Sequence, residues 1–173
     1  MNDTINAFAQ YLSFGLGRET YAIGIHPIRE IFEAPTLTAI PMTPPYVRGV
    51  INVRGAVVPV VDLALRFGRA QTEIGRRTCV IIVEVAATGD DSGELRHIGL
   101  LVDAVNEVLE VRSDEIGERP SFGLGIRSDF VQAMIRRGEQ FIVVIEPGQV
   151  VAAAVLEMAP ASTDALPVAA LAG

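Results

Sequence analysis

The chain is organised around the stretch 41-PMTPPYVRGVINVRGAVVPVVDLALRFG-68. Residues 46–53 and 56–61 are two runs rich in valine and isoleucine, separated by the dipeptide Arg54-Gly55. β-branched residues favour strands, and a two-residue break that contains glycine is typical of a tight hairpin turn. The stretch therefore predicts a β-hairpin with the charged side chain of Arg54 at its tip.

The end of the same stretch predicts a short helix. Asp62 is a good N-cap, because its carboxylate can accept hydrogen bonds from the first free amides of a helix. Gly68 suits the left-handed position that follows a helix. Pro59 lies inside the second run, and since proline cannot donate to a ladder, we expect that strand to be bulged or to lie at an edge there.

Short strand patterns dominate the rest of the chain. Leu12, Phe14 and Leu16 alternate with polar or small residues, and the same period continues over 21–25 after a polar turn, which predicts a hairpin. Further apolar runs predict strands at 78–85, 96–105 and 106–111, and a last hairpin formed by 130–135 and 141–145.

Three segments have helical features. Pro27 suits a first helical position, and Ile28, Ile31 and Phe32 fall on one helical face, so we expect a helix over 27–33. Residues 113–117 predict a helical turn, and residues 147–156 a short closing helix. Strands nevertheless outnumber helices, and no long amphipathic helix alternates with them. This excludes a doubly wound α/β sheet and favours an all-β fold with short helices, built from small antiparallel barrels.

Composition narrows the class of protein. The chain has 173 residues, 50% of them hydrophobic, and a net charge of -7, which disfavours nucleic acid as a partner because phosphate binding needs a basic face. The single cysteine, Cys79, fits a reducing compartment. No signal peptide and no bilayer-spanning apolar run is found, so we expect a cytoplasmic protein without direct membrane insertion. We further expect a flexible lead-in at 1–9, a polar loop at 86–95 and a disordered tail at 157–173.

Catalytic chemistry has little support in the sequence. Asp62 and Asp103 could form the carboxylate pair of a hydrolase, but no nucleophile, metal cluster or phosphate loop accompanies them. His26 and His97 lack ligand spacing, so we expect no metal and no cofactor. We therefore expect a binding protein rather than an enzyme.

The order of the predicted pieces resembles one known family, the chemotaxis coupling proteins or CheW-like domains. The resemblance covers residues 10–156 as a single domain, and its most specific part is the run from Gly49 to Leu63. The segments that carry it are Phe14–Ile25, 28-IREI-31, 40-IPMTPP-45, 47-VRGVINVRG-55, 58-VPVVDL-63, 99-GLLVDAV-105 and Phe141–Ile145.

This resemblance implies a fold and a function. The fold is two side-by-side five-stranded SH3-like β-barrels that share a hydrophobic core. The function is that of a non-enzymatic adaptor, which couples the cytoplasmic tips of chemoreceptors to the regulatory domain of a CheA-like histidine kinase and is recruited to membrane receptor arrays through these partners. A coupling module of a non-chemotactic two-component pathway is the alternative.

The resemblance also implies a binding site. It pairs Glu30 with Arg54. Taken by themselves, an arginine at a turn tip is usually solvated, and a glutamate such as Glu30 is most often a solvated charge on a helix. It also implies an apolar receptor groove between the barrels, with Ile28, Ile31, Val50, Val102, Val105 and Val108 as its candidate residues.

Overall fold

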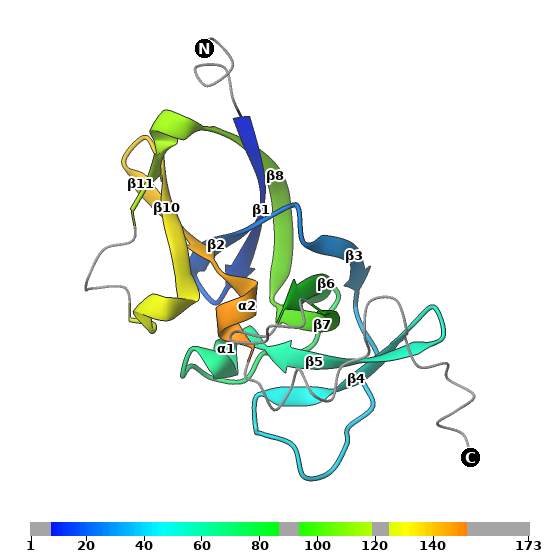
Figure 1. The fold of residues 1–173 in the computed structure, drawn as a ribbon. Helices are drawn as coiled ribbons and strands as arrows, with labels where there is room; N and C mark the ends of the chain where they lie inside the picture. The colour runs from blue at the N-terminus through cyan, green and yellow to red at the C-terminus, as the bar shows by residue number, and fades with distance from the viewer. Residues whose placement is uncertain (1–7, 87–93, 119–124, 152–173) are drawn as a thin grey trace.

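The computed structural model describes residues 8–86, 94–118 and 125–151, and in these ranges the chain is mostly β (Figure 1). The helices are short: α1 (Leu63–Arg66), α2 (Pro147–Val150) and two single 3-10 turns, η2 (Ser113–Glu115) and η3 (Ser128–Phe130). None of the helices in these ranges is long and apolar enough to cross a membrane. The all-β class with short helices is thus confirmed.

The strands form two sheets, which we call the first and the second barrel. The first barrel has the order β8 (Ala104–Arg112), β1 (Phe8–Leu16), β2 (Glu19–Gly24), β11 (Gln140–Ile145), β10 (Val131–Arg137) and β9 (Ile116–Gly117). The second has the order β3 (Ile28–Glu33), β6 (Cys79–Ala86), β7 (Leu95–Val102), β5 (Ala56–Asp62) and β4 (Val47–Val53). The paired SH3-like barrels are therefore confirmed, with the two-residue β9 as a sixth strand in the first.

Side-chain alternation along β6 explains how the barrels come to share a core. Val80 and Ile82 belong to a cluster inside the second barrel, whereas Ile81 and Val83 belong to a larger cluster that includes residues of both barrels. Successive side chains of a strand point to opposite faces of the sheet. A strand of this kind is apolar on both faces, which is why residues 79–85 form an almost continuous apolar run.

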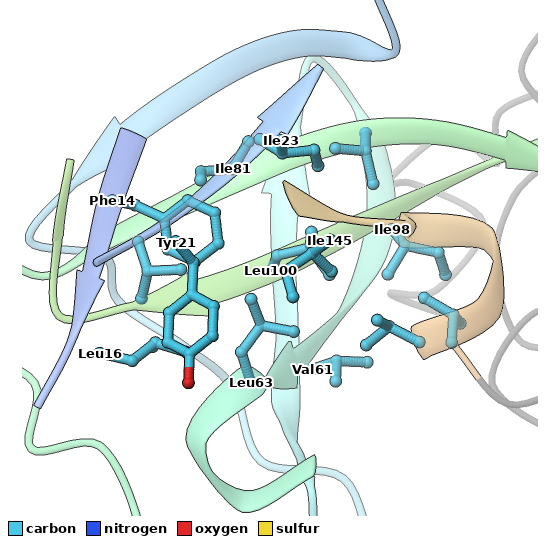
Figure 2. Close-up of a cluster of buried hydrophobic side chains, with 14 of the residues drawn as sticks. Phe14, Leu16, Tyr21, Ile23, Val61, Leu63, Ile81, Ile98, Leu100 and Ile145 are labelled. Carbon is cyan, nitrogen blue, oxygen red and sulfur yellow. The ribbon is translucent and has the colours of Figure 1, made fainter. Parts of the chain in front are cut away.

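The larger cluster, which we call the shared core, joins the barrels into one unit. Figure 2 shows its two halves: Phe14, Leu16, Tyr21, Ile23 and Ile145 come from the first barrel, and Val61, Leu63, Ile81, Ile98 and Leu100 come from the second barrel and α1. All ten side chains are at most 2% exposed. Burying each large apolar side chain contributes about 1.5–3 kcal/mol, so separating the barrels would expose a large apolar surface to water.

The predicted helix at 27–33 is wrong, because Ile28–Glu33 forms strand β3 against β6. The register shifts between Ile28 and Glu30, so Ile28 lies opposite Val83 while Ile31 lies opposite Ile81. A bulge of this kind adds one residue to one strand. It places Ile28 and Ile31 toward the same face at a spacing of three, which imitates the spacing of a helix.

The predicted boundary between the strands at 96–105 and 106–111 is also wrong. The break falls at Asp103, between β7 and β8, where the chain passes from the second barrel to the first. The Asp103 amide donates to the Gly15 carbonyl at 3.0 Å, and its carboxylate accepts from the Gly17 amide at 2.5 Å. These two bonds fix the crossing point, and they also give the Asp103 carboxylate a structural partner.

Pro59 is placed where its missing N–H is not needed. Strand β5 lies inside its sheet, but its pairing with β7 begins only at Val60. On the other side Pro59 lies opposite Val50, whose own amide and carbonyl bond to Thr38 instead. As a whole, β5 is therefore an inner strand and not an edge strand. Only at Pro59 itself is the side that faces β7 unpaired, as at an edge.

Several expectations lie outside the described residues. These are the lead-in up to residue 7, most of the loop at 86–95, and the chain after Val151, which contains the rest of the expected closing helix and the tail. Within the described part, β1 begins at Phe8, and the hairpin of β10 and β11 is confirmed.

We predict that Gly99→Ala destabilises the second barrel. A Cβ at Gly99 would lie 2.7 Å from Val80 Cγ1 and 3.0 Å from Val60 Cγ2. Overpacking of this kind costs about 1–3 kcal/mol, which urea denaturation would measure. Gly24→Ala is the matched control, because nothing lies within 4 Å of its Cβ position. Equal free energies of unfolding for the two variants would contradict the prediction.

Candidate docking surface

Arg54 lies at the tip of the predicted hairpin, which the structure confirms. Arg54 and Gly55 are the two central residues of the turn, with φ of 52° and 86°, and Val53 pairs with Ala56 across it. Positive φ at both central positions is the requirement of a type I′ turn. The Asn52 side-chain oxygen accepts from the Gly55 amide at 3.1 Å, which holds the turn closed.

The backbone at Arg54 is unfavourable for an arginine. The left-handed region costs roughly 1–2 kcal/mol for a residue with a Cβ, and Gly and Asn are the residues that tolerate it best. The side chain of Arg54 is 82% exposed, so burial of the side chain does not offset this cost. A strained backbone of this kind at an exposed position points to a role for the side chain itself.

Glu30 is the charge partner of Arg54. The distance from Arg54 Nε to Glu30 Oε2 is 3.4 Å, and the Glu30 side chain is 29% exposed. Glu30 comes from β3 and Arg54 from the turn after β4, and these are the two outer strands of the five-stranded sheet. An exposed pair contributes only about 0–1 kcal/mol, so its main effect is to orient the two side chains across the end of the second barrel.

The apolar candidates differ in their exposure. Ile31 and Val108 are 39% and 47% exposed, so both present apolar surface to solvent. Ile28 and Val105 are half-buried and pack against the shared core, and Val50 is half-buried on β4. Val102 is 0% exposed and is itself part of the shared core. We therefore assign Val102 to the core and keep the other five as candidate surface residues.

These candidates come from both barrels. Ile28 and Ile31 lie on β3 of the second barrel, whereas Val105 and Val108 lie on β8 of the first, opposite Phe14 and Leu12 of β1. Ile28 and Val105 pack against the same shared core from the two sides. We call Ile28, Glu30, Ile31, Val50, Arg54, Val105 and Val108 the docking surface; its members come from both barrels.

A second ion pair on β3 was missed by the sequence. Arg29 donates from Nε to Glu84 Oε2 at 2.6 Å, its Nη2 also contacts this oxygen, and His97 Nε2 lies 3.8 Å from Glu84 Oε1. Glu84 is on β6 and His97 is opposite it on β7. The sequence carries no signal for this cluster, because its members are brought together only by strand pairing.

Asp62 is a structural residue. Its carboxylate is 0% exposed and accepts from the Ala64 and Leu65 amides, at 3.0 and 3.3 Å, so the predicted N-cap is confirmed. It also accepts from the amide and hydroxyl of Thr72 at 3.0 Å each and pairs with Arg48 Nη1 at 2.8 Å. A buried carboxylate with all these partners is not free to act on a substrate.

Metal ligation finds no support in the described ranges. No group of three or more His, Cys, Asp and Glu residues lies together there in a way that could hold a metal ion. The one cysteine, Cys79, is buried, and burial raises the pKa of its thiol.

Comparisons with known proteins agree with this geometry. The family model for the CheW-like domain matches residues 10–155. The chemotaxis protein CheW of Rhizobium meliloti (strain 1021) is 31% identical over 141 residues, which cover 82% of this chain and 86% of that protein. The probable chemotaxis protein CheW of Rhizobium etli is 31% identical over 137 residues, 79% of this chain and 83% of that protein.

A solved structure is similar as well. The crystal structure of the scaffolding protein TtCheW from Thermoanaerobacter tengcongensis matches with a TM-score of 0.71 and 31% identity. The match covers 81% of this chain and 90% of that chain.

We predict that Arg54→Asn leaves the free energy of unfolding unchanged or raises it by up to about 1 kcal/mol, because asparagine tolerates the left-handed backbone better than arginine. Arg54→Val is the control; its β-branched side chain should lower stability by more than about 1 kcal/mol at this φ. Chemical denaturation would measure both. A large loss of stability in the asparagine variant would show that the Arg54 side chain has a structural role.

We also predict that Asp62→Ala lowers the free energy of unfolding by about 3–5 kcal/mol, because it leaves the largely buried Arg48 charge without its partner. Asp114→Ala is the matched control, since Asp114 is 73% exposed in its pair with Arg112. The control should cost no more than about 1 kcal/mol. Similar losses in the two variants, measured by thermal or urea unfolding, would refute the assignment of Asp62 as a buried anchor.

Proposed function

This chain belongs to the CheW-like domain family, and on that premise we propose that it couples the cytoplasmic tips of chemoreceptors to the regulatory domain of a CheA-like histidine kinase. It is a chemotaxis adaptor. The observation that supports the site of coupling best is Arg54, an exposed arginine held in an unfavourable backbone conformation and paired with Glu30. This combination stabilises the fold little, so its value lies in recognition of a partner.

The docking surface has the properties that an adaptor needs. Ile31 and Val108 supply exposed apolar area on two different barrels, while Glu30 and Arg54 supply charge beside it. Apolar contacts provide most of the affinity of an interface, and charged groups fix its register and its specificity. Because the surface is mounted on strands that share a core, it can hold a partner without rearranging the backbone.

Binding to two partners at once requires a second surface. A chain of two barrels has faces on each barrel away from their junction, so a kinase domain and a receptor tip can be held side by side. We propose that receptor and kinase recruit the chain to membrane arrays in this way, through protein contacts alone.

The adaptor is proposed to be non-enzymatic. Asp62 and Asp103 were the only candidate for a catalytic carboxylate pair, and both have structural partners: Asp62 in the buried network with Arg48 and Thr72, and Asp103 on the Gly17 amide. Carboxylates engaged in this way hold the fold. This argues against the hydrolase alternative.

The proposed role of Arg54 is tested by charge reversal. Arg54→Glu should leave thermal unfolding nearly unchanged, because the side chain is mostly exposed, but should weaken the ternary complex with a chemoreceptor signalling fragment and the kinase regulatory domain by about ten-fold or more, the equivalent of 1.4 kcal/mol. A pull-down and a titration with each partner would measure this. An unchanged ternary complex would refute the proposed role of Arg54 in partner binding.

Two further variants sharpen this test. Arg136→Glu makes the same charge change at another exposed arginine, on β10 of the first barrel, and should leave receptor binding unchanged. The double variant Glu30→Arg, Arg54→Glu restores the ion pair in reverse order. Recovered binding would mean that the pair acts by orienting the turn, whereas continued loss would mean that Arg54 contacts the partner directly.

A further inference from the structure

The segment that follows β5 reaches from the second barrel into the first. Leu63 and Phe67, at the two ends of α1, both belong to the shared core. The Phe67 ring lies 5.6 Å from the Tyr21 ring and 5.8 Å from the Phe130 ring, measured between centroids, and both of these partners belong to the first barrel. This segment therefore places its apolar side chains between the barrels.

Arg66, the last residue of α1, connects three elements with one side chain. Its guanidinium carbon lies 4.8 Å from the centroid of the Tyr46 ring and 4.9 Å from that of Phe130. Tyr46 immediately precedes β4 in the second barrel, and Phe130 immediately precedes β10 in the first. The Arg66 Nε also donates to the Val150 carbonyl at 2.7 Å, at the end of α2. The carbonyls at the end of a helix lack partners within it, so this bond supplies one.

Arg69 makes a second connection to the first barrel, three residues further on. Its Nη1 donates to the Tyr21 hydroxyl at 2.5 Å and lies 2.6 Å from Glu19 Oε1, both on β2. Burial raises the pKa of the Tyr21 hydroxyl, so it remains a neutral partner for the arginine. Tyr21 is itself a residue of the shared core (Figure 2), so this polar connection starts from the apolar one.

We propose that Arg66 is a positioning residue that fixes the orientation of the two barrels and, through it, the geometry of the docking surface. The second half of this proposal rests on the proposed function; the first half does not. Ile31 and Arg54 belong to the second barrel and Val108 to the first, so their relative positions follow the orientation of the barrels.

The directionality of the Arg66 contacts distinguishes them from the shared core. Apolar burial is non-directional and depends mainly on the area removed from water. The core by itself therefore strongly favours contact between the barrels but only weakly specifies the angle between them. A planar guanidinium that lies over two rings and also donates a hydrogen bond specifies an orientation. Lysine keeps the charge but is a flexible point charge that cannot reproduce this geometry.

The orientation is tested by residual dipolar couplings of backbone N–H groups, with no partner present. In the wild-type protein, one alignment frame should fit the couplings of both barrels. In Arg66→Met each barrel should keep its internal couplings, while the frames of the two barrels no longer coincide; Arg66→Lys should show a smaller change. Val58→Ala is the control, because Val58 is fully buried inside the second barrel and does not belong to the shared core. A common frame in both Arg66 variants would overturn the proposal.

The effect on docking is measured with the same variants. Arg66→Met should weaken binding of the receptor fragment by about ten-fold, whereas Val58→Ala, which lowers stability without touching the contact between the barrels, should change binding by less than about two-fold. Equal losses in the two variants would overturn the docking half of the proposal. A wild-type protein that binds neither receptor nor kinase would refute the proposed function instead, and the couplings would still decide the role of Arg66.

Discussion

Apolar packing between the two barrels, in the shared core, holds strands from both halves of the chain together. Each sheet has its own interior cluster, but the strands β6 and β7 also carry a second apolar face, which packs against β1 and β2 of the other barrel. This second face makes two small barrels into one unit. It also explains the composition, since strands buried on both sides require more apolar residues than strands with one solvated face.

The shared core constrains where a docking surface can lie. Near the junction, burial of the side chains changes over a few residues of the chain. Val102 lies in the core, Val105 is half-buried, and Val108 is exposed. A surface formed at such a junction is held in place by the core, because Ile28 and Val105, on the same strands as the exposed residues Ile31 and Val108, pack against it. The strained turn of Arg54 lies on the same framework, which keeps its cost from being relieved by local movement.

Buried and half-buried polar groups fix the relative arrangement of strands and helices, which apolar packing alone leaves less well defined. Asp62 joins β5, α1, β4 and the segment around Thr72 through one buried carboxylate, and Arg66 joins α1 to the first barrel. Buried polar groups are costly unless all their partners are present. Their presence at the ends of the core therefore selects one arrangement among those that apolar packing alone would permit.

Features that depend on neighbours along the chain could be predicted from the sequence. The hairpin at Arg54-Gly55, the cap at Asp62 and the left-handed Gly68 all follow from turn and capping chemistry, and the order of these pieces was enough to indicate the family. The helix expected at 27–33 was wrong for a related reason, because a bulge in β3 imitates helical spacing and only the partner strand β6 reveals it.

Contacts between residues far apart in the chain could not be predicted and follow from the folded structure. Arg29 pairs with Glu84 across 55 positions, and Arg66 bonds to Val150 across 84. The distinction between Val102 in the core and Val108 on the surface was likewise missed, because both valines lie in predicted strands and only the packing of the barrels separates them. Such contacts are set by the order of the strands in each sheet and by the packing of one barrel on the other. Both depend on the whole chain, so no local sequence pattern can predict them.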